Sequence, residues 1–502
     1  MGGRWSSIAG KVLAGIGIGV PGRWVAPELV DEVLAEAGQA AAGRRFRALP
    51  GRLGVYFVLG LCLLSDRPYR QVLEDLASGL GGPLGAAGWQ VPASTALTAV
   101  RRRLGEKPFE LLFRRLAGPL GAGTAPWSRI GGLLAVAWDG TTIKAPASEA
   151  NIAAFGRPGG TKDGHYPQVR LVMLVACGTR ALAGAAMGPL RGKGTGEQAL
   201  ARDLLGSLRK GMLLLADRNF YGYRLWNAAA GTGADLLWRV SATVRLRPVR
   251  ELPDGSWLAH IDDPAEVARR ARRNGARRRR GSALPPGAGP LPGITVRVIE
   301  FALTVTADDG TARTGRYRLI TTLLDCRRHP AGQLAAGYAW RWAVETGLAE
   351  FKTCLRGRGR ILRSRTPELA RQELWAYLAI CQLIRSVIAL AAAGAGLDPD
   401  RISFTTTLHA IRRTLPGART SPGTALAETE ASILAVLVPR REGRVCLRAA
   451  IRSSSPFPSR HNAKGPLSQH AEHTITIRHP HQAPEATTDQ HRHPRNQENQ
   501  PP

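Results

Sequence analysis

Four residues near position 345 have the types and spacing expected of side chains that contact phosphate groups. Tyr338, Arg341, Glu345 and Lys352 lie in the segment YAWRWAVETGLAEFK, at steps of three, four and seven residues. On an α-helix these steps place all four side chains within roughly a 60° arc. One helix face would then carry an aromatic ring, two cations and one carboxylate. An ordinary salt bridge between Arg341 and Glu345 is the simpler interpretation of this spacing.

Two further acids follow apolar segments that resemble buried strands. Asp139 comes after LLAVAW, and Asp217 comes after GMLLLA. Carboxylates at strand ends can converge with Glu345, and three carboxylates can bind two hard divalent cations such as Mg²⁺ or Mn²⁺. Such a site transfers phosphoryl groups while Arg341 and Lys352 hold the flanking phosphates. Asp139 and Asp217 could instead be helix N-caps or turn residues.

The composition points to a polyanionic partner such as nucleic acid. The 502 residues include 69 Lys and Arg against 38 Asp and Glu, which gives a formal net charge of +31. The six cysteines are scattered without a CxxC pair, which favours a reducing cytoplasm over a disulfide framework or a zinc site. The apolar run 55–64 is too short to cross a bilayer, so we expect no contact with a membrane.

The apolar patterns divide the chain into parts that would position these acids. We predict an α/β fold with the following parts: a flexible N-terminus (1–24), a helical domain that binds DNA (25–125), a catalytic core in two pieces (126–242 and 319–415), a β insertion with a basic loop (243–318), and a C-terminal extension (416–502) that is disordered from about 455. The arginine run 269–280 is consistent with contact to the DNA backbone and equally with simple solvation. Residues 367–393 predict a long helix packed in the core.

The acidic segments together resemble a known family. DGT at Asp139, DRNFYG at Asp217, and Tyr-x2-Arg-x3-Glu-x6-Lys at 338–352 resemble the DDE motifs and YREK signature of IS4-family insertion-sequence transposases. The N-terminal helical segment resembles the domain attached to many of these proteins. The resemblance covers roughly residues 25–415. It implies an RNase H-like catalytic core that is interrupted by a β domain between the second and third acids.

The resemblance also implies an activity and roles for individual residues. The chain would be a cut-and-paste transposase of the bacterial nucleoid, acting through a hairpin intermediate on double-stranded DNA at the transposon ends and at the target. A homodimer would hold the two ends. Asp139, Asp217 and Glu345 would hold two Mg²⁺ or Mn²⁺ ions. The expected DNA contacts are Tyr338, Arg341, Lys352 and Arg218, with Tyr317 or Trp342 stacking on a flipped base.

Three alternatives remain at this point. Tyr317 and Trp342 could be core residues, and this interpretation is stronger for Trp342. A domesticated or decayed transposase would bind DNA without cutting it, although the three acids argue against this. Another RNase H-like nuclease would act on structured nucleic acid, but Tyr338, Arg341 and Lys352 around the third acid disfavour that class.

Overall fold

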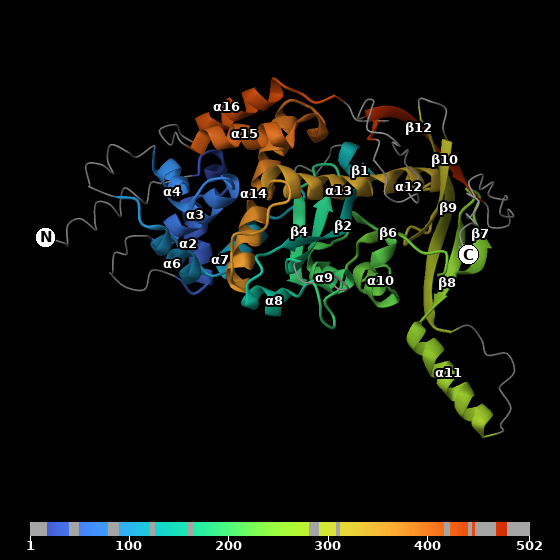
Figure 1. Cartoon of the computed structure of the whole chain (residues 1–502). Helices are drawn as coiled ribbons and strands as arrows, with labels where there is room; N and C mark the ends of the chain where they lie inside the picture. The colour runs from blue at the N-terminus through green and yellow to red at the C-terminus, as the bar shows by residue number, and fades with distance from the viewer. Residues whose placement is uncertain are drawn as a thin grey trace, which may run out of the picture.

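The computed structural model shows a mixed α/β protein with one large sheet and a group of helices beside it (Figure 1). The structure describes residues 18–39, 50–78, 90–120, 126–158, 165–280, 291–307, 312–415, 422–439, 444–446 and 468–478. Most of the expected flexible N-terminus and most of the tail after 455 lie outside the described residues. The predicted combination of an α/β core with a helical N-terminal region is confirmed.

The N-terminal helices lie beside one long helix from the C-terminal half. They are η1 (Val20–Arg23), α2 (Pro27–Glu36), α3 (Gly51–Leu63), α4 (Tyr69–Ala77), α6 (Ser94–Leu104) and α7 (Lys107–Leu116). The long helix α14 (Pro367–Gly394) packs against α3 and α7. It is long and apolar enough to cross a membrane, but 89% of its apolar stretch is buried inside the protein. The prediction of a packed core helix at 367–393 is therefore confirmed.

Strands that lie between Arg129 and Ile477 form the sheet. They are β1 (Arg129–Ile130), β2 (Leu133–Lys144), β3 (Gln168–Ala176), β4 (Leu182–Pro189), β5 (Met212–Ala216), β6 (Asp235–Arg239), β7 (Arg247–Glu251), β8 (Trp257–Asp262), β9 (Gly293–Ala307), β10 (Ala312–Thr321), β11 (Arg444–Cys446) and β12 (Ser468–Ile477). The main order is β11-β12-β9-β10-β6-β5-β2-β3-β4. Strand β2 is antiparallel to β3 and parallel to β5, which is in turn parallel to β6.

Helices cover both faces of the sheet and bury two cores. Besides α14 and the N-terminal helices, the helical elements in this part of the chain are η3 (Pro126–Ser128), α8 (Glu149–Phe155), α9 (Glu197–Asp203), η4 (Leu205–Ser207), η5 (Arg218–Phe220), α10 (Tyr223–Ala230), α12 (Ala331–Tyr338), η6 (Ala339–Arg341), α13 (Trp342–Ala349), η7 (Glu350–Leu355), η8 (Pro399–Arg401), α15 (Phe404–Thr414) and α16 (Pro422–Leu434). Helices α9 and α10 cover one face through Leu200 and Trp226. Helix α13 covers the opposite face through Val344 and Leu348.

The strands of the expected β insertion continue the main sheet. Strand β10 pairs with β9 along its length, and its last three residues pair with β6, for example Ile320 with Trp238. The expected boundary at residue 318 therefore falls inside β10. Because β10 runs through Thr321 without a break, apolar patterning alone could not show where the core resumes.

The arginine run is helical, so the prediction of a basic loop is wrong for residues 269–279. Helix α11 (Pro264–Arg279) begins at Asp263, whose side chain accepts a hydrogen bond from the Ala265 N–H. Pro264 at the first helical position favours this start, and arginine is a good helix former. None of its residues is buried, and the helix projects away from the rest of the described chain (Figure 1).

The tail contains an ordered strand, so the prediction of disorder from about 455 is wrong for residues 468–477. Strand β12 pairs antiparallel with β9, from Ala471 opposite Ala307 to Ile477 opposite Phe301. Ile475 and Ile477 pack against the core on the α13 side of the sheet. The prediction failed because the tail has few apolar residues of its own, whereas β9 offers an edge that satisfies its backbone hydrogen bonds.

Candidate active site

The two aspartates lie side by side because β2 and β5 are parallel and in register. The pairs Val136 with Leu214 and Ala137 with Leu215 extend by two positions to Asp139 and Asp217. Neighbouring strands lie about 4.8 Å apart, so the two backbones are adjacent at this point. Asp217 directly follows β5, as predicted. Asp139 lies within β2 instead of ending it, because β2 continues to Lys144 along β3 while β5 stops at Ala216.

Both aspartates share a sheet face with the helix that carries Glu345. Side chains alternate between the two faces of a strand, so Asp139 lies on the side of Ala137, and Asp217 on the side of Leu215. Ala137 and Leu215 belong to the core that also contains Val344 of α13. Asp139 and Asp217 therefore lie on the face that α13 covers.

Glu345 forms the expected ion pair with Arg341. The Arg341 Nη2 atom donates to Oε1 of Glu345 at 2.8 Å. Burial of Arg341 acts to lower its pKa, but Tyr338, Glu345 and Asp217 act in the opposite direction and the net pKa is raised. Its Nε atom is buried without a hydrogen-bond partner among the described residues. One guanidinium therefore serves as the counter-charge for more than one acid of the site.

The surroundings of Asp139 disfavour the ionised form of its carboxyl group. The pKa of its carboxyl group is raised to about 6, and burial is the largest cause. The carboxylates of Glu345 and Glu197 contribute to the rise, whereas the Gly140 N–H, which donates to Oδ1 at 2.8 Å, and the Arg341 guanidinium act against it. A buried carboxylate near other negative charges is destabilised in its ionised form, and a bound cation would reduce this destabilisation.

Tyr338 connects the helical segment to the strand that ends at Asp217. Its hydroxyl donates to the carbonyl oxygen of Ala216 at 3.2 Å. The side chain is buried, and burial raises its pKa. This contact positions the helix against β5.

Lys352 reaches the other side of the site. Its Nζ atom donates to Oγ1 of Thr141 on β2 at 2.7 Å. Its pKa is lowered by burial and by the charge of Arg356, while Asp139 acts to raise it. The helical segment is therefore held to β5 through Tyr338 and to β2 through Lys352.

The four YREK residues occupy one helical segment whose geometry changes along its length. Arg341 ends a 3₁₀ turn, Glu345 lies on α-helix, and Lys352 lies in a π-helical turn that begins at Glu350. The prediction of one continuous helical segment is confirmed, but the 60° arc assumed α-helical geometry throughout. Single π turns occur often at functional sites.

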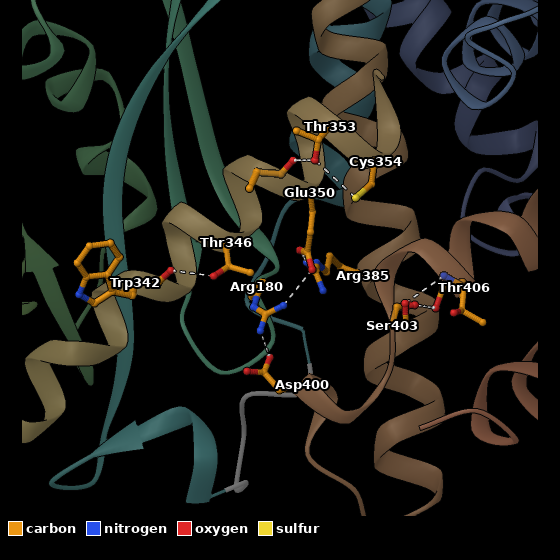
Figure 2. Close-up of polar contacts among 12 residues, drawn as sticks. Arg180, Trp342, Thr346, Glu350, Thr353, Cys354, Arg385, Asp400, Ser403 and Thr406 are labelled. Atoms are coloured by element: carbon orange, nitrogen blue, oxygen red, sulfur yellow. Dashed lines mark hydrogen bonds and ion pairs between the residues drawn. The ribbon is translucent and has the colours of Figure 1, made fainter. Parts of the chain in front are cut away.

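A buried cluster of charges fixes the start of this π turn (Figure 2). Glu350 accepts from Arg180 Nη1 at 3.0 Å and is also paired with Arg385 of α14. Arg180 additionally pairs with Asp400 at 2.6 Å. We call Glu350, Arg180 and Arg385 the Glu350 clamp. It joins the YREK segment to the β3–β4 turn and to the long core helix.

Contacts on the sheet face opposite α13 fix the backbone around the two aspartates. The Trp138 ring lies 5.7 Å from both Phe220 and Trp238, measured between ring centroids. Gln198 of α9 donates to the carbonyl oxygens of Asn219 and Tyr221, at 2.9 and 3.1 Å. These contacts hold β2 at Trp138 and the turn after Asp217, and thus the backbones of both aspartates.

The remaining predicted residues lie in different surroundings. Arg218 is exposed next to Asp217. Trp342 is 38% exposed beside the Arg341 guanidinium, so its interpretation as a core residue is wrong. Tyr317 of β10 stacks on Phe301, with ring centroids 5.1 Å apart, and lies under the Arg239 guanidinium.

The donor chemistry suits a hard divalent cation, although the acids are not gathered into a ligand set. Among the residues that the structure describes, no three His, Cys, Asp or Glu side chains are close enough to hold a metal ion. Hard cations prefer carboxylate oxygens, and the raised pKa of Asp139, caused mainly by burial, shows that its ionised form is disfavoured here. The residue types of the site therefore fit a hard divalent cation. In the structure, the Glu345 carboxylate forms an ion pair with Arg341.

Sequence reasoning missed three residues that shape this site. Thr141 lies within the DGTT segment and accepts the Lys352 hydrogen bond. Glu197 lies so close to β2 that a Cβ atom at Gly140 would come within 2.3 Å of its carboxylate. Glu350 anchors the π turn. The DGTT segment offered a signal for Thr141, but contacts between elements distant in sequence left none for the other two.

Comparison with known proteins gives two family matches and two relatives among transposases. Residues 131–383 match the family described as "Transposase DDE domain", and residues 17–114 match "Insertion element 4 transposase N-terminal". The chain is 29% identical over 412 residues to "Transposase InsG for insertion sequence element IS4" of Escherichia coli, covering 80% of this chain and 84% of that protein. It is 28% identical over 205 residues to "Putative transposase InsZ" of the same organism, covering 40% of this chain and 65% of that protein.

A solved structure, the piggyBac transposase synaptic complex with hairpin DNA, is similar with a TM-score of 0.38 and 10% identity, covering 82% of this chain and 84% of that one. A likeness at this level supports no argument. The DDE domain itself implies dependence on a divalent metal ion. The two family matches and the InsG relative show that the chain belongs to the IS4 family of DDE transposases and is an insertion-sequence transposase, an enzyme that processes DNA.

Proposed function

We propose that this transposase binds the terminal inverted repeats of its insertion sequence and cuts and joins them with divalent metal held by Asp139, Asp217 and Glu345. The observation that carries the proposal is the register of β2 and β5, which aligns the two aspartates on the face covered by α13. The ions would be Mg²⁺ or Mn²⁺, two per site. Such ions activate an attacking oxygen and stabilise the leaving oxygen.

The strand arrangement supports an RNase H-like core for this chemistry. Strands β2, β3 and β4 form a consecutive antiparallel unit, and β5 and β6 then add in parallel on the other side of β2. The inserted strands β7 to β10 follow β6, between the second and third acids. That is the position in which the resemblance places a β domain.

The cations around the acids would hold DNA phosphates. Arg341 and Lys352 approach the site from the helical segment, and Arg218 is exposed beside Asp217. Tyr338 would contribute mainly by positioning, because its hydroxyl already donates to Ala216. For a flipped base, the exposed Trp342 is a better candidate than Tyr317, whose ring is already stacked on Phe301.

The proposed reaction is a series of in-line displacements at phosphorus. Water attacks at the transposon end, and the 3′ oxygen leaves as a hydroxyl group. That hydroxyl attacks the opposite strand to form a hairpin, water reopens the hairpin, and the 3′ ends attack target DNA. Each step forms one P–O bond and breaks one, while the attacking oxygen loses a proton and the leaving oxygen gains one.

Two copies of the protein would hold the two transposon ends, and the reaction would take place in the bacterial cytoplasm.

Neutral variants of the three acids test the assignment. Asp139→Asn, Asp217→Asn and Glu345→Gln should each reduce Mg²⁺-dependent nicking of a labelled end to undetectable levels while gel shifts still show end binding, because these side chains would hold metal. Asp203→Asn, an exposed change on α9, is the matched control and should cleave normally. Strong cleavage by any of the three variants would remove that residue from the site. A wild-type chain that binds ends without cutting would favour the decayed-transposase alternative.

A further inference from the structure

An arginine-lined cleft lies beyond the end of the YREK segment and has no part in the mechanism above. It consists of two hollows of about 410 and about 680 Å³, which share Asp66 and Arg67. The turn between α3 and α4, the loop after η7, and helices α14 and α15 form its walls. We call this feature the arginine cleft.

The lining of the arginine cleft carries a net positive charge, with six arginines against the carboxylates of Asp66 and Glu373. Arg67 is paired with Asp75, and the Glu373 carboxylate accepts from the Arg363 N–H and, at 2.7 Å, from the Ser364 hydroxyl. Five arginines of the lining form no ion pair with a carboxylate in the described part of the chain: Arg356, Arg360, Arg363, Arg412 and Arg413. The cleft therefore attracts anions.

Several of these guanidinium groups are held in place by neutral acceptors. Arg363 Nη1 donates to the carbonyl oxygen of Arg67 at 2.8 Å, and Arg412 Nε donates to that of Leu63 at 2.7 Å. Carbonyl oxygens fix the orientation of an arginine without cancelling its charge. A set of cations fixed in this way is preorganised for a ligand that carries several negative charges.

Arg356 supplies an observation independent of net charge. Its side chain lines the cleft and is 5% exposed. Its Nη2 atom donates to the carbonyl oxygen of Arg360 at 3.1 Å, but its buried Nε atom has no hydrogen-bond partner among the described residues. A buried donor without an acceptor is costly and uncommon. The Arg356 guanidinium, which lines the cleft, therefore retains unused hydrogen-bonding capacity.

The cleft begins close to the active-site segment in the sequence. Arg356 follows Lys352 by four residues, and its charge contributes to the lowered pKa of Lys352 after the larger effect of burial. Arg360 lines the cleft one loop further on. Each strand of duplex DNA carries one negative charge per about 3.4 Å of helix axis, so a row of cations suits a strand that leaves the active site.

We propose that the arginine cleft binds the phosphodiester backbone of the DNA next to the cleavage point. The inference rests on the proposed function in taking DNA as the substrate. It adds a second binding site, formed jointly by the N-terminal helices and the C-terminal part of the core. Because phosphates are the ligand, the contribution of this site does not depend on base sequence.

The salt dependence of binding tests the proposal. The double variant Arg360→Gln, Arg413→Gln removes two exposed arginines of the cleft. If each binds one phosphate, the slope of log K against log salt should become shallower by about 1.8, on end DNA and on unrelated duplex alike. The matched control Arg202→Gln, Arg224→Gln removes the same charge from exposed positions on α9 and α10, across the sheet, and should keep the wild-type slope.

Methylphosphonate substitution, one phosphate at a time, locates the contact on DNA. The wild-type protein should lose affinity at particular neutralised positions next to the cleavage point, and the cleft variant should be insensitive at those same positions. Equal slopes for the cleft and control variants, or a methylphosphonate profile that the cleft variant leaves unchanged, would overturn the inference. Wild-type nicking measured in parallel separates the two proposals, because the inference can fail while metal-dependent cleavage by the wild-type protein persists.

Discussion

Two arginine–carboxylate groups lie five residues apart on one helical segment and differ in burial and in pairing. Glu345 is 33% exposed and has one partner, Arg341 at 2.8 Å. Glu350 is 14% exposed and lies between Arg180 and Arg385, which are 7% and 3% exposed. The same residue types on one segment thus form an open group near the aspartates and a closed group on the side of α14.

The two groups differ in how completely their positive and negative charges neutralise one another. In the Glu350 clamp, a single carboxylate is bonded through both oxygens to two guanidinium groups. At the candidate active site, Arg341 faces the acids, and Asp139 retains a raised pKa. The clamp therefore stabilises the fold, whereas the acids of the active site carry an electrostatic cost that a cation would relieve.

The largest expected effect is the loss of the clamp. Glu350→Ala should lower the free energy of unfolding by about 3–5 kcal/mol, because it removes the carboxylate that the buried Arg180 and Arg385 share, and only Arg180 keeps a second carboxylate, that of Asp400. Glu345→Ala is the matched control from the open group and should lower it by at most about 1 kcal/mol. Urea unfolding of both variants measures the contrast. Equal losses would show that burial does not distinguish the two groups.

The open group could be predicted from the sequence because its signals are local. The spacing of Arg341 and Glu345 predicts their ion pair, and the apolar segments before Asp139 and Asp217 predict strands that deliver acids to one place. The structure aligns these aspartates through the register of β2 and β5. The local sequence pattern was sufficient because the residues of each signal lie within about fifteen positions of one another.

The Glu350 clamp could not be predicted because its members come from distant parts of the chain. Arg180 lies in a tight turn with a φ of 54°, and Arg385 lies in an apolar helix where it seemed only to interrupt the pattern. The pairing of β12 with β9 likewise depends on a partner more than 160 residues away. Helix α11 is a different case, because its N-cap Asp263 and Pro264 were local signals that the arginine run obscured.

The second expected effect has the opposite sign and concerns Asp139. Its carboxyl group has a pKa of about 6 in the folded protein, compared with an ordinary value of 3.8. Above pH 6 it is ionised in both the folded and the unfolded states, and the folded state bears the full cost. Below about pH 4 it is neutral in both states and the cost disappears. Asp139→Asn should therefore stabilise the metal-free protein by at most about 3 kcal/mol at pH 7.

Thermal unfolding in EDTA at several pH values measures this gain. The difference between Asp139→Asn and wild type should shrink as the pH falls through 6 and should vanish near pH 4. Asp203→Asn on α9, an exposed change of the same kind, should differ from wild type by less than about 0.5 kcal/mol throughout. A gain for Asp139→Asn that does not vary with pH would mean that the carboxyl group is not electrostatically strained.

The smallest expected effect on stability concerns Lys352. It distinguishes a role in positioning the helical segment from a role in binding a DNA phosphate. Lys352 donates one hydrogen bond to Thr141 at 2.7 Å, so Lys352→Ala and Thr141→Val should each lower the free energy of unfolding by about 1 kcal/mol or less. Thr141→Val removes that bond but keeps the charge of Lys352. If Lys352 holds a flanking phosphate, only Lys352→Ala should weaken formation of the end complex in a gel shift. Equal weakening by both variants would mean that Lys352 acts by positioning the helix against β2, and the phosphate contact would then have to come from Arg341 or Arg218.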